Sequence, residues 1–245
     1  AAATRLHEHL GGASVVGHTR GKRRTVGRDW VEERLEVAGA PAPLRYRQPE
    51  GGFSQPNAAM AQEMLGWARA VAREDLAAVG STGPPREDDL LELYCGNGNF
   101  AVALAPCFRR VLATELVKSA VEAAGLNAEA NGASNVCLAR VSAEELAQAL
   151  DGARRFQRLA HLDLGGFDLR TVLVDPPRAG LGGQVTAALA ARFPRIVYIS
   201  CNPQTLREDL ETLCATHCIR RIAAFDQFPY TDHLEMGVLL VRRDE

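Results

Sequence analysis

Apolar residues along this chain follow two alternating patterns. From residue 90 onward, short unbroken apolar runs alternate with longer segments in which apolar residues recur at every third or fourth position. Unbroken runs are typical of strands buried on both faces, and the wider spacing is typical of helices that bury one face. The predicted strands are 90–94, 111–115, 136–140, 171–174, 196–200, 221–225 and 238–241. The predicted helices between them are 100–105, 119–131, 143–150, 184–191 and 203–215.

Strands that alternate with helices form βαβ units, so the pattern predicts an α/β fold with a mostly parallel sheet. Ligands of such sheets bind at the carboxyl ends of the strands, and chemistry is therefore expected directly after each strand. A further helix is predicted over residues 57–79, followed by a loop over residues 81–89 that is rich in glycine, proline and acidic residues.

The first 52 residues have a different character. Two short β-like segments, 13–18 and 23–26, precede a proline-rich stretch that ends in the turn at residues 50–52. This composition predicts the remnant of a smaller β-containing domain and a linker over residues 1–52. We expect the main domain to span residues 53–245.

Composition narrows the class of protein. A hydrophobic content of 47% over 245 residues allows a substantial core. No apolar stretch has the length of a membrane span, and His7, Glu8 and His9 stand where a signal peptide needs apolar residues, so we expect a cytoplasmic protein. The six cysteines form no CxxC pair, which indicates reduced thiols. Cys214 and Cys218 stand at one-turn spacing without a second ligand pair, so we interpret them as helix-packing residues and predict no metal site.

The net charge of the chain does not show whether the protein binds a nucleic acid. The net charge is −2, although basic residues gather locally. The basic clusters are Arg20 to Arg24 with Arg28, Arg45 with Arg47, and Arg154, Arg155 and Arg158. Any one such cluster is more typical of a solvated surface than of an RNA contact.

Cys201 is the most informative single residue. It follows the apolar run 195–200 and precedes Asn202-Pro203, a good N-cap with a favoured first helical residue. The unpaired N–H groups at a helix start favour the thiolate, which is the nucleophilic form of cysteine. The alternative is a buried cysteine that packs as a small apolar residue.

Two further motifs follow predicted strands. The segment Tyr94 to Ala101 contains Gly96 and Gly98, which permit a tight turn and a close approach of the backbone to a ligand. Glu115, about 20 positions later, suits ribose hydroxyls, and the pattern fits both NAD and S-adenosylmethionine. The fourth strand ends in Asp175-Pro176-Pro177-Arg178, a carboxylate at a rigid corner, although a loop that only ends a strand would also fit.

Together these motifs resemble the tRNA (uracil-5-)-methyltransferases, which use S-adenosylmethionine to form 5-methyluridine in the T-arm of tRNA. The resemblance covers nearly the whole chain. It rests on Phe53-Ser54-Gln55-Pro56-Asn57, residues 92–100, Ala113-Thr114-Glu115, Asp175-Pro176-Pro177-Arg178, Ser200-Cys201-Asn202-Pro203, Asp226-Gln227-Phe228-Pro229-Tyr230 and His233-Leu234-Glu235. Related ribosomal-RNA enzymes tend to carry alanine in place of Pro177 and methionine in place of Gln227, so these two residues favour the tRNA branch.

The resemblance implies a Rossmann-like class I methyltransferase fold with seven strands, the last inserted antiparallel. It implies Cys201 as the nucleophile, Glu235 as the base, S-adenosylmethionine as the cofactor and no metal. The residues implied around the cofactor are Gln55, Tyr94, Gly96, Asn99, Glu115 and Asp175. The implied partner is the T-arm loop of tRNA, with other RNAs that have a similar loop as further candidates.

One departure from the family and two alternatives remain. Family members carry an amino-terminal region before the point at which this chain starts, so we expect part of the RNA-contacting surface to be missing.

An NAD-dependent oxidoreductase would explain the glycine loop and Glu115 but leaves Cys201, Asp175 and Glu235 without roles. An RNA-binding module or chaperone that keeps the scaffold without turnover is the second alternative.

Overall fold

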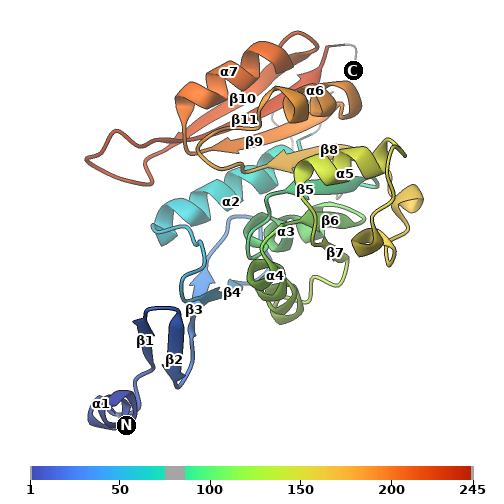
Figure 1. Ribbon diagram of the computed structural model, residues 1–245. Coiled ribbons are helices and arrows are strands. Elements are labelled where there is room, and N and C mark those ends of the chain that lie inside the picture. Colours follow the sequence, from blue (N-terminus) through green and yellow to red (C-terminus); the bar gives the residue numbers. More distant parts are fainter. Residues whose placement is uncertain (1, 75–85, 244–245) are drawn as a thin grey trace.

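The computed structural model describes residues 2–74 and 86–243. A central sheet with helices on both faces forms the main body, and a small hairpin projects from it beside the amino-terminal helix (Figure 1). The helices are α1 (Ala2–His9), α2 (Ala58–Ala72), α3 (Asn99–Leu104), α4 (Lys118–Ala130), α5 (Ala143–Leu150), α6 (Gly183–Arg192) and α7 (Pro203–Leu213). The strands are β1 (Val15–Thr19), β2 (Lys22–Val26), β3 (Trp30–Leu35), β4 (Leu44–Pro49), β5 (Asp89–Leu93), β6 (Val111–Thr114), β7 (Val136–Ala139), β8 (Leu169–Val174), β9 (Arg195–Ser200), β10 (His217–Phe225) and β11 (Glu235–Arg242).

The main sheet of the described residues has seven strands in the order β10-β11-β9-β8-β5-β6-β7. The five strands from β9 to β7 pair in parallel, and β11 lies antiparallel between β9 and β10. The carboxyl ends of β6, β5, β8 and β9 therefore meet at one edge of the sheet. The predicted α/β architecture, including the inserted antiparallel strand, is confirmed.

Two hydrophobic cores cover the two faces of the sheet. Leu90 faces the core formed with α2 and α3, whereas its neighbour Leu91 faces the core formed with α5, α6 and α7. Helices α2 to α4 and helices α5 to α7 accordingly lie on opposite faces (Figure 1). Because the central strands are buried on both faces, their sequences are unbroken apolar runs rather than alternating ones.

The helix predicted over residues 57–79 is shorter in the structure. It begins after the N-cap Asn57, whose side chain accepts a hydrogen bond from the Met60 N–H, and it ends at Ala72. Residues 75–79, like residues 81–85 of the predicted loop, lie outside the described residues.

The interpretation of Cys214 and Cys218 as neighbours on one helix is wrong. Cys214 ends α7, whereas Cys218 lies in β10, which starts at His217 rather than at the predicted residue 221. The Cys218 thiol donates to the Val241 carbonyl oxygen of the adjacent strand at 3.4 Å. Strand pairing with β11 therefore overrides the helical spacing of these residues.

A ribbon formed by β3 and β4 joins the core beside α4. Tyr46 of β4 is fully buried, and its hydroxyl donates to the Asn99 carbonyl oxygen at 2.8 Å. The Asn127 side chain of α4 accepts from the Arg47 N–H at 2.7 Å and donates to the Arg47 carbonyl oxygen at 3.3 Å. Asn131 bonds to the backbone of Arg45 in the same way. The sequence pattern does not predict these strands, because charged residues interrupt them and tertiary contacts decide their conformation.

Within the described part of the chain, no helix is both long and apolar enough to cross a bilayer. The six cysteines are free thiols. Among residues 2–74 and 86–243, no group of three or more His, Cys, Asp or Glu side chains is arranged to hold a metal ion.

Candidate functional site

The carboxyl edge of the sheet brings together residues that are far apart in the sequence. Leu93, the last residue of β5, pairs with Thr114 of β6 and with Val174 of β8. The residues that follow these three are Tyr94, Glu115 and Asp175. Because parallel strands keep this register, the three side chains leave the sheet side by side along one edge.

Cys201 and Glu235 meet at the next pair of strands. Ser200 at the end of β9 pairs with Met236 of β11, and one further step of this antiparallel register places Glu235 opposite Cys201. The carboxyl groups of Glu235 and Asp175 both act electrostatically on the Cys201 thiol. The structure therefore places the predicted nucleophile, the predicted base and Asp175 in one cluster.

The glycine loop after β5 is held by Glu115. One carboxylate oxygen of Glu115 accepts from the Gly96 N–H at 3.2 Å, and the other accepts from Leu116 and Val117 at 2.7 and 2.8 Å. Gly96 has φ +55°, which glycine adopts without strain. The carboxylate thus fixes the loop, and the oxygen that accepts from Gly96 keeps one further lone pair for a ligand.

Tyr94 marks the start of this loop with an unusual backbone conformation. Its φ is +62°, in the left-handed region that residues with side chains seldom adopt. Burial raises the pKa of its hydroxyl to about 12. Backbone strain of this kind is frequent at functional sites, where the surrounding structure holds the residue in place.

A single cleft contains most of the predicted cofactor residues. Gln55, Tyr94, Gly96, Asn99 and Asp175 all line it. Gln55 comes from the segment before α2, Asn99 from the start of α3, and Asp175 from the end of β8. Three separate segments thus converge on the carboxyl edge, as expected for the ligand site of a parallel sheet.

Glu115 lines a larger cavity that adjoins this cleft. The cavity measures about 610 Å³ and shares Phe53, Gly96 and Asn97 with the cleft. Its other wall includes Trp30 of the β3–β4 ribbon. All six predicted cofactor residues therefore line one continuous depression.

Cys201 lies between β9 and α7, as the sequence predicts. Asn202 is the N-cap of α7, and its side chain accepts from the Gln204 N–H at 3.1 Å. The expectation that the helix start lowers the pKa of the thiol is wrong: burial raises the pKa of Cys201, and the carboxyl groups of Glu235 and Asp175 raise it further. In the protein alone these effects outweigh the nearby Arg178 and a backbone hydrogen bond of the thiol, both of which lower its pKa.

The two carboxyl groups of the cluster are themselves perturbed. Burial and the charge of Glu235 raise the pKa of Asp175 to about 8. Burial also raises the pKa of Glu235, against the opposing effect of the Arg178 guanidinium. Arg178 donates to Nδ1 of His233 at 2.7 Å, which holds this cation beside the cluster. Such shifts suit groups that exchange protons near neutral pH.

Two residues of the site were not identified from the sequence. Glu92 lines the cleft, is almost completely buried, and has an Oε2 atom without a hydrogen-bond partner; burial raises the pKa of its carboxyl group well above its ordinary value. Gln227 donates to the Gln55 Oε1 atom at 2.6 Å. The available signal for Glu92 was its charge within an otherwise apolar, doubly buried strand.

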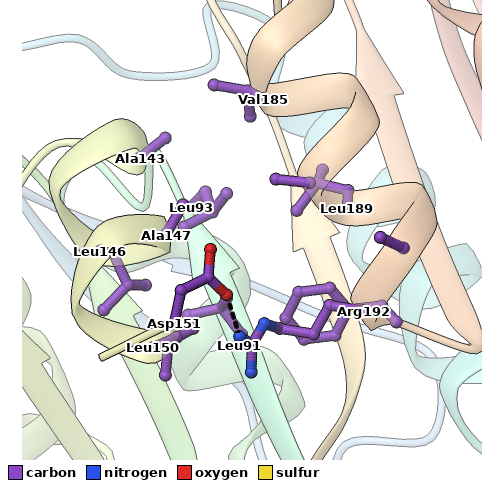
Figure 2. Close-up of a pocket in the computed structure, with 13 residues that line it drawn as sticks. Leu91, Leu93, Ala143, Leu146, Ala147, Leu150, Asp151, Val185, Leu189 and Arg192 are labelled. Carbon is purple, nitrogen blue, oxygen red and sulfur yellow. Dashed lines mark hydrogen bonds and ion pairs between the residues drawn. The ribbon is translucent and has the colours of Figure 1, made fainter. Parts of the chain in front are cut away.

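Another cavity, of about 330 Å³, lies between α5 and α6 (Figure 2). Its labelled side chains are mostly aliphatic, and an ion pair between Arg192 and Asp151 spans its rim. None of the predicted site residues lines it. Its shape alone therefore gives no reason to place the chemistry there.

Comparison with known proteins agrees with this site. The family model described as tRNA (Uracil-5-)-methyltransferase matches residues 1–243. The tRNA/tmRNA (uracil-C(5))-methyltransferase of Azotobacter vinelandii is 56% identical over 242 residues, which are 99% of this chain and 63% of that protein. The corresponding protein of Stutzerimonas stutzeri is 55% identical over 232 residues, 95% of this chain and 60% of that protein. The chain thus spans about three fifths of the length of these relatives.

Solved structures show the same architecture. The tRNA (uracil-54, C5)-methyltransferase of Pyrococcus abyssi, in complex with S-adenosyl-L-homocysteine, is similar with a TM-score of 0.64 and 28% identity, covering 89% of this chain and 46% of that one. The tRNA m1G37 methyltransferase of M. jannaschii, with a TM-score of 0.54 and 11% identity, covers 90% of this chain and 59% of that one. The fold is the Rossmann-like fold of class I methyltransferases.

Proposed function

The chain belongs to the tRNA (uracil-5-)-methyltransferase family, and we propose that it methylates carbon 5 of a uridine in tRNA with S-adenosylmethionine as the methyl donor. The observation that carries the proposal is the cluster of Cys201, Glu235 and Asp175 beside the cleft that contains Gln55, Tyr94 and the glycine loop. A nucleophile, a base and a ligand cleft at one sheet edge are the groups that this reaction needs.

The residues present fit S-adenosylmethionine. Glu92 leaves an unpartnered buried oxygen in the cleft, and Asp175 places a second carboxyl group there, so the site offers acceptors to a cationic ligand. The Oε2 atom of Glu115 accepts only from the Gly96 N–H and can also accept from a ribose hydroxyl, and the exposed Val117 adjoins it as an apolar surface for a base. S-adenosylmethionine supplies the electrophilic methyl group and the positive charge of its sulfonium.

Cys201 and Glu235 divide the chemistry between them. Carbon 5 of uracil is a weak nucleophile, so the Cys201 thiolate adds to carbon 6 and the electron pair moves onto carbon 5 and its neighbouring carbonyl. Carbon 5 then takes the methyl group and carries both that group and its original hydrogen. Glu235 removes this hydrogen as a proton, the carbon 6–sulfur bond breaks, and the sulfur leaves as the thiolate.

The pKa shifts of Cys201 and Glu235 fit these steps. The raised pKa of Cys201 means that its proton must leave before the thiolate attacks; because Glu235 has to be unprotonated when carbon 5 loses its hydrogen, this first proton passes to solvent at the half-buried thiol. The raised pKa of Glu235 makes it a stronger base than an exposed glutamate. Arg178 stabilises negative charge on both groups, because its cation lowers the pKa of each.

The proposed substrate is a uridine in the T-arm loop of tRNA, with other RNAs that carry a similar loop as further substrates. The base must turn out of its loop to reach the thiol at the sheet edge. We assign the catalytic domain to residues 53–245 and an RNA-facing remnant with its linker to residues 1–52. A protein acting on tRNA in this way would work in the cytoplasm.

The test is transfer of a labelled methyl group to unmodified tRNA, analysed on a denaturing gel. We expect labelled tRNA from the unchanged protein, no transfer and no covalent complex from Cys201→Ala, and a denaturant-resistant protein–RNA complex bearing the label from Glu235→Gln. In Glu235→Gln the thiolate can still attack and carbon 5 can still be methylated, but the elimination stalls. Free product released at the normal rate by Glu235→Gln would remove Glu235 from the proposed role.

Two other outcomes would point to a different function. Binding of NAD but not S-adenosylmethionine in calorimetry would indicate an oxidoreductase. Binding of tRNA and S-adenosylmethionine without any methyl transfer would indicate an RNA-binding protein that has kept the scaffold without turnover.

A further inference from the structure

The β1–β2 hairpin carries a positive charge that the packing of the fold does not require. Between Ala13 and Arg28 the chain contains no Asp or Glu. Its Lys and Arg residues are Arg20, Lys22, Arg23, Arg24 and Arg28. The residues of β2 from Lys22 to Thr25 are all exposed, so the hairpin adds almost nothing to the core. Like charges held this close repel one another and lower stability unless a ligand compensates them.

The charges are divided between two faces of the hairpin. Arg23 lies opposite His18, and both reach acidic groups: Arg23 pairs with Asp29 at 3.2 Å and with Glu50 at 3.0 Å, and His18 contacts Glu50 at 3.0 Å. This face is neutralised and ties the hairpin to Asp29, just before β3, and to the turn at residues 50–52.

The other face carries Lys22 and Arg24 opposite the uncharged Thr19 and Gly17. Side chains of alternate strand residues point to the same face, so the two cations lie side by side. In the part of the chain that the structure describes, neither has an acidic partner. Arg20 adds a third such cation at the turn, where it precedes Gly21 with φ +69°.

The hairpin is continuous with the candidate site. Arg23 and Trp30 line the same cavity as Glu115 and Gly96. The Trp30 ring is flanked by two guanidinium groups, that of Arg28 at 4.9 Å and that of Arg47 at 4.6 Å from its centroid. The cavity thus reaches the hairpin through Arg23, on the neutralised face, and a ring flanked by cations lies between the hairpin and the edge of the sheet. Aromatic rings among cations of this kind fit nucleic acids.

We propose that the face formed by Arg20, Lys22 and Arg24 binds the sugar–phosphate backbone of the RNA substrate, away from the nucleotide that enters the cleft. This inference rests on the proposed function, and it names the surface that holds the substrate. Contacts of this kind position an RNA without reading its sequence. An anionic lipid surface fits less well, because the hairpin turn presents Arg20, Gly21 and Lys22 with no apolar side chain to insert.

The test replaces Lys22 and Arg24 with serine and measures binding of labelled unmodified tRNA over a range of salt concentrations. Each lost phosphate contact lowers the salt dependence of log Kd by about 1, so we expect a slope smaller by about 2. Relative to about 1 M salt, where such contacts contribute little, this slope corresponds to roughly 100-fold weaker binding at about 100 mM salt. In methyl transfer the KM for tRNA should rise while kcat and the affinity for S-adenosylmethionine stay unchanged.

The matched control removes two positive charges elsewhere, as Arg220→Ser with Arg243→Ser. Both residues are exposed and lie at the end of β10 and β11 opposite to Glu235, because His217 pairs with Arg242 while Phe225 pairs with Glu235. We expect this variant to bind tRNA as the unchanged protein does. The exchange of Lys22→Arg with Arg24→Lys keeps both charges and should also keep the affinity.

Three results would overturn the proposal. The first is an unchanged tRNA affinity and salt slope in the Lys22→Ser, Arg24→Ser variant, and the second is an equal loss in the control. The third is binding of the hairpin face to phosphatidylserine vesicles with no effect on tRNA. Failure of the proposed function is recognised separately, because the unchanged protein would then transfer no methyl group although its tRNA affinity could still be measured.

Discussion

At the scale of single residues, Glu115 has two tasks that compete for one carboxylate. It accepts three backbone N–H groups, from Gly96, Leu116 and Val117, and in the proposed function it also accepts the ribose hydroxyls. The loop geometry and the ligand contacts therefore depend on the same side chain. Sequence spacing predicts the second task, whereas only the structure shows the first.

Glu115→Ala should weaken S-adenosylmethionine binding by about 2 kcal/mol, or roughly 30-fold in Kd, the scale of hydrogen bonds to a charged group. Calorimetry measures this directly. Glu129→Ala, an exposed carboxylate on α4, is the matched control and should bind normally. A folded Glu115→Ala protein with unchanged affinity would show that the cofactor does not use this side chain.

The buried carboxyl group of Asp175 makes the stability of the protein depend on pH. Its pKa rises from 3.8 to about 8, so between these pH values the folded protein holds a proton that the unfolded chain has released. Where the unfolded state binds fewer protons, stability falls as pH rises. The contribution of Asp175 to stability is therefore greatest at low pH and is progressively lost between pH 3.8 and about 8.

Asp175→Asn should remove the loss of stability that Asp175 causes as the pH rises. We expect the melting temperature of Asp175→Asn to exceed that of the unchanged protein at pH 8 by more than about 2 °C, and the gap to shrink at pH 5. Thermal unfolding followed by circular dichroism at both pH values measures the gap. Glu63→Gln, at an exposed position of α2, should show no such trend. A gap that is the same at both pH values would contradict the raised pKa.

At the scale of elements, the sequence predicts best where local pattern and tertiary environment agree. Helix 143–150 has the predicted bounds, and its N-cap Ser142 forms a capping box with Glu145. The central strands are correct to within a few residues, because burial on both faces produces apolar runs that no other element of this length shows. That the last of the seven strands is inserted antiparallel came from the family resemblance and not from the pattern, and the order of the strands comes from the structure.

The errors occur where tertiary contacts oppose the local pattern. The charged and proline-flanked residues of β3 and β4 gave no strand signal, yet the side chains of Asn127 and Asn131 fix the backbone of β4, which pairs with β3. The thiol pKa of Cys201 had the wrong direction because a helix start is visible in sequence, whereas the two carboxyl groups that face the thiol come from other strands. Glu92 was not identified although its charge stands within an otherwise apolar strand, because only the structure shows that its side chain lines the cleft.

Asp209 of α7 joins the elements that carry the cluster. Its buried carboxylate accepts from the Tyr198 hydroxyl of β9 at 2.7 Å, from the Leu181 N–H at 2.9 Å and from the Thr186 hydroxyl of α6 at 3.0 Å. Cys201 lies between β9 and α7, and Leu181 closes the loop that follows Asp175. The network thus fixes the position of two segments that end in the site.

Asp209→Ala leaves the Tyr198 hydroxyl and the Leu181 N–H without their acceptor, whereas the Thr186 hydroxyl can still donate to the Gly182 carbonyl oxygen. The substitution should lower the free energy of unfolding by about 3 kcal/mol. Urea unfolding measures this change. Glu208→Ala, at an exposed position of the same helix, should change it by less than about 0.5 kcal/mol. Equal effects of the two substitutions would mean that the network contributes no stability of its own.

At the scale of the whole molecule, the amino-terminal segment divides into two parts with different roles. Among residues 2–34, none belongs to either hydrophobic core, whereas Leu35, Val37, Leu44 and Tyr46 are buried in the core shared with α2 and α3. The predicted boundary at residue 52 stays a prediction, and the position of these four side chains suggests how to test it. The hairpin faces the proposed RNA, and the ribbon supports the fold.

Two shortened proteins separate these roles. A chain that begins at Asp29 loses α1 and the hairpin but keeps all four core residues, so we expect it to unfold in urea at nearly the same midpoint and to bind S-adenosylmethionine normally. Its affinity for tRNA should fall with the loss of the basic face.

A chain that begins at Phe53 also loses the four buried side chains, each of which contributes about 1.5–3 kcal/mol through burial. Their sum approaches the whole stability of a typical domain, about 5–15 kcal/mol, so this chain should be largely unfolded or bind no cofactor. If instead it unfolds at the same urea concentration as the chain from Asp29 and binds S-adenosylmethionine equally well, the catalytic domain begins at residue 53 and the β3–β4 ribbon is dispensable for its fold.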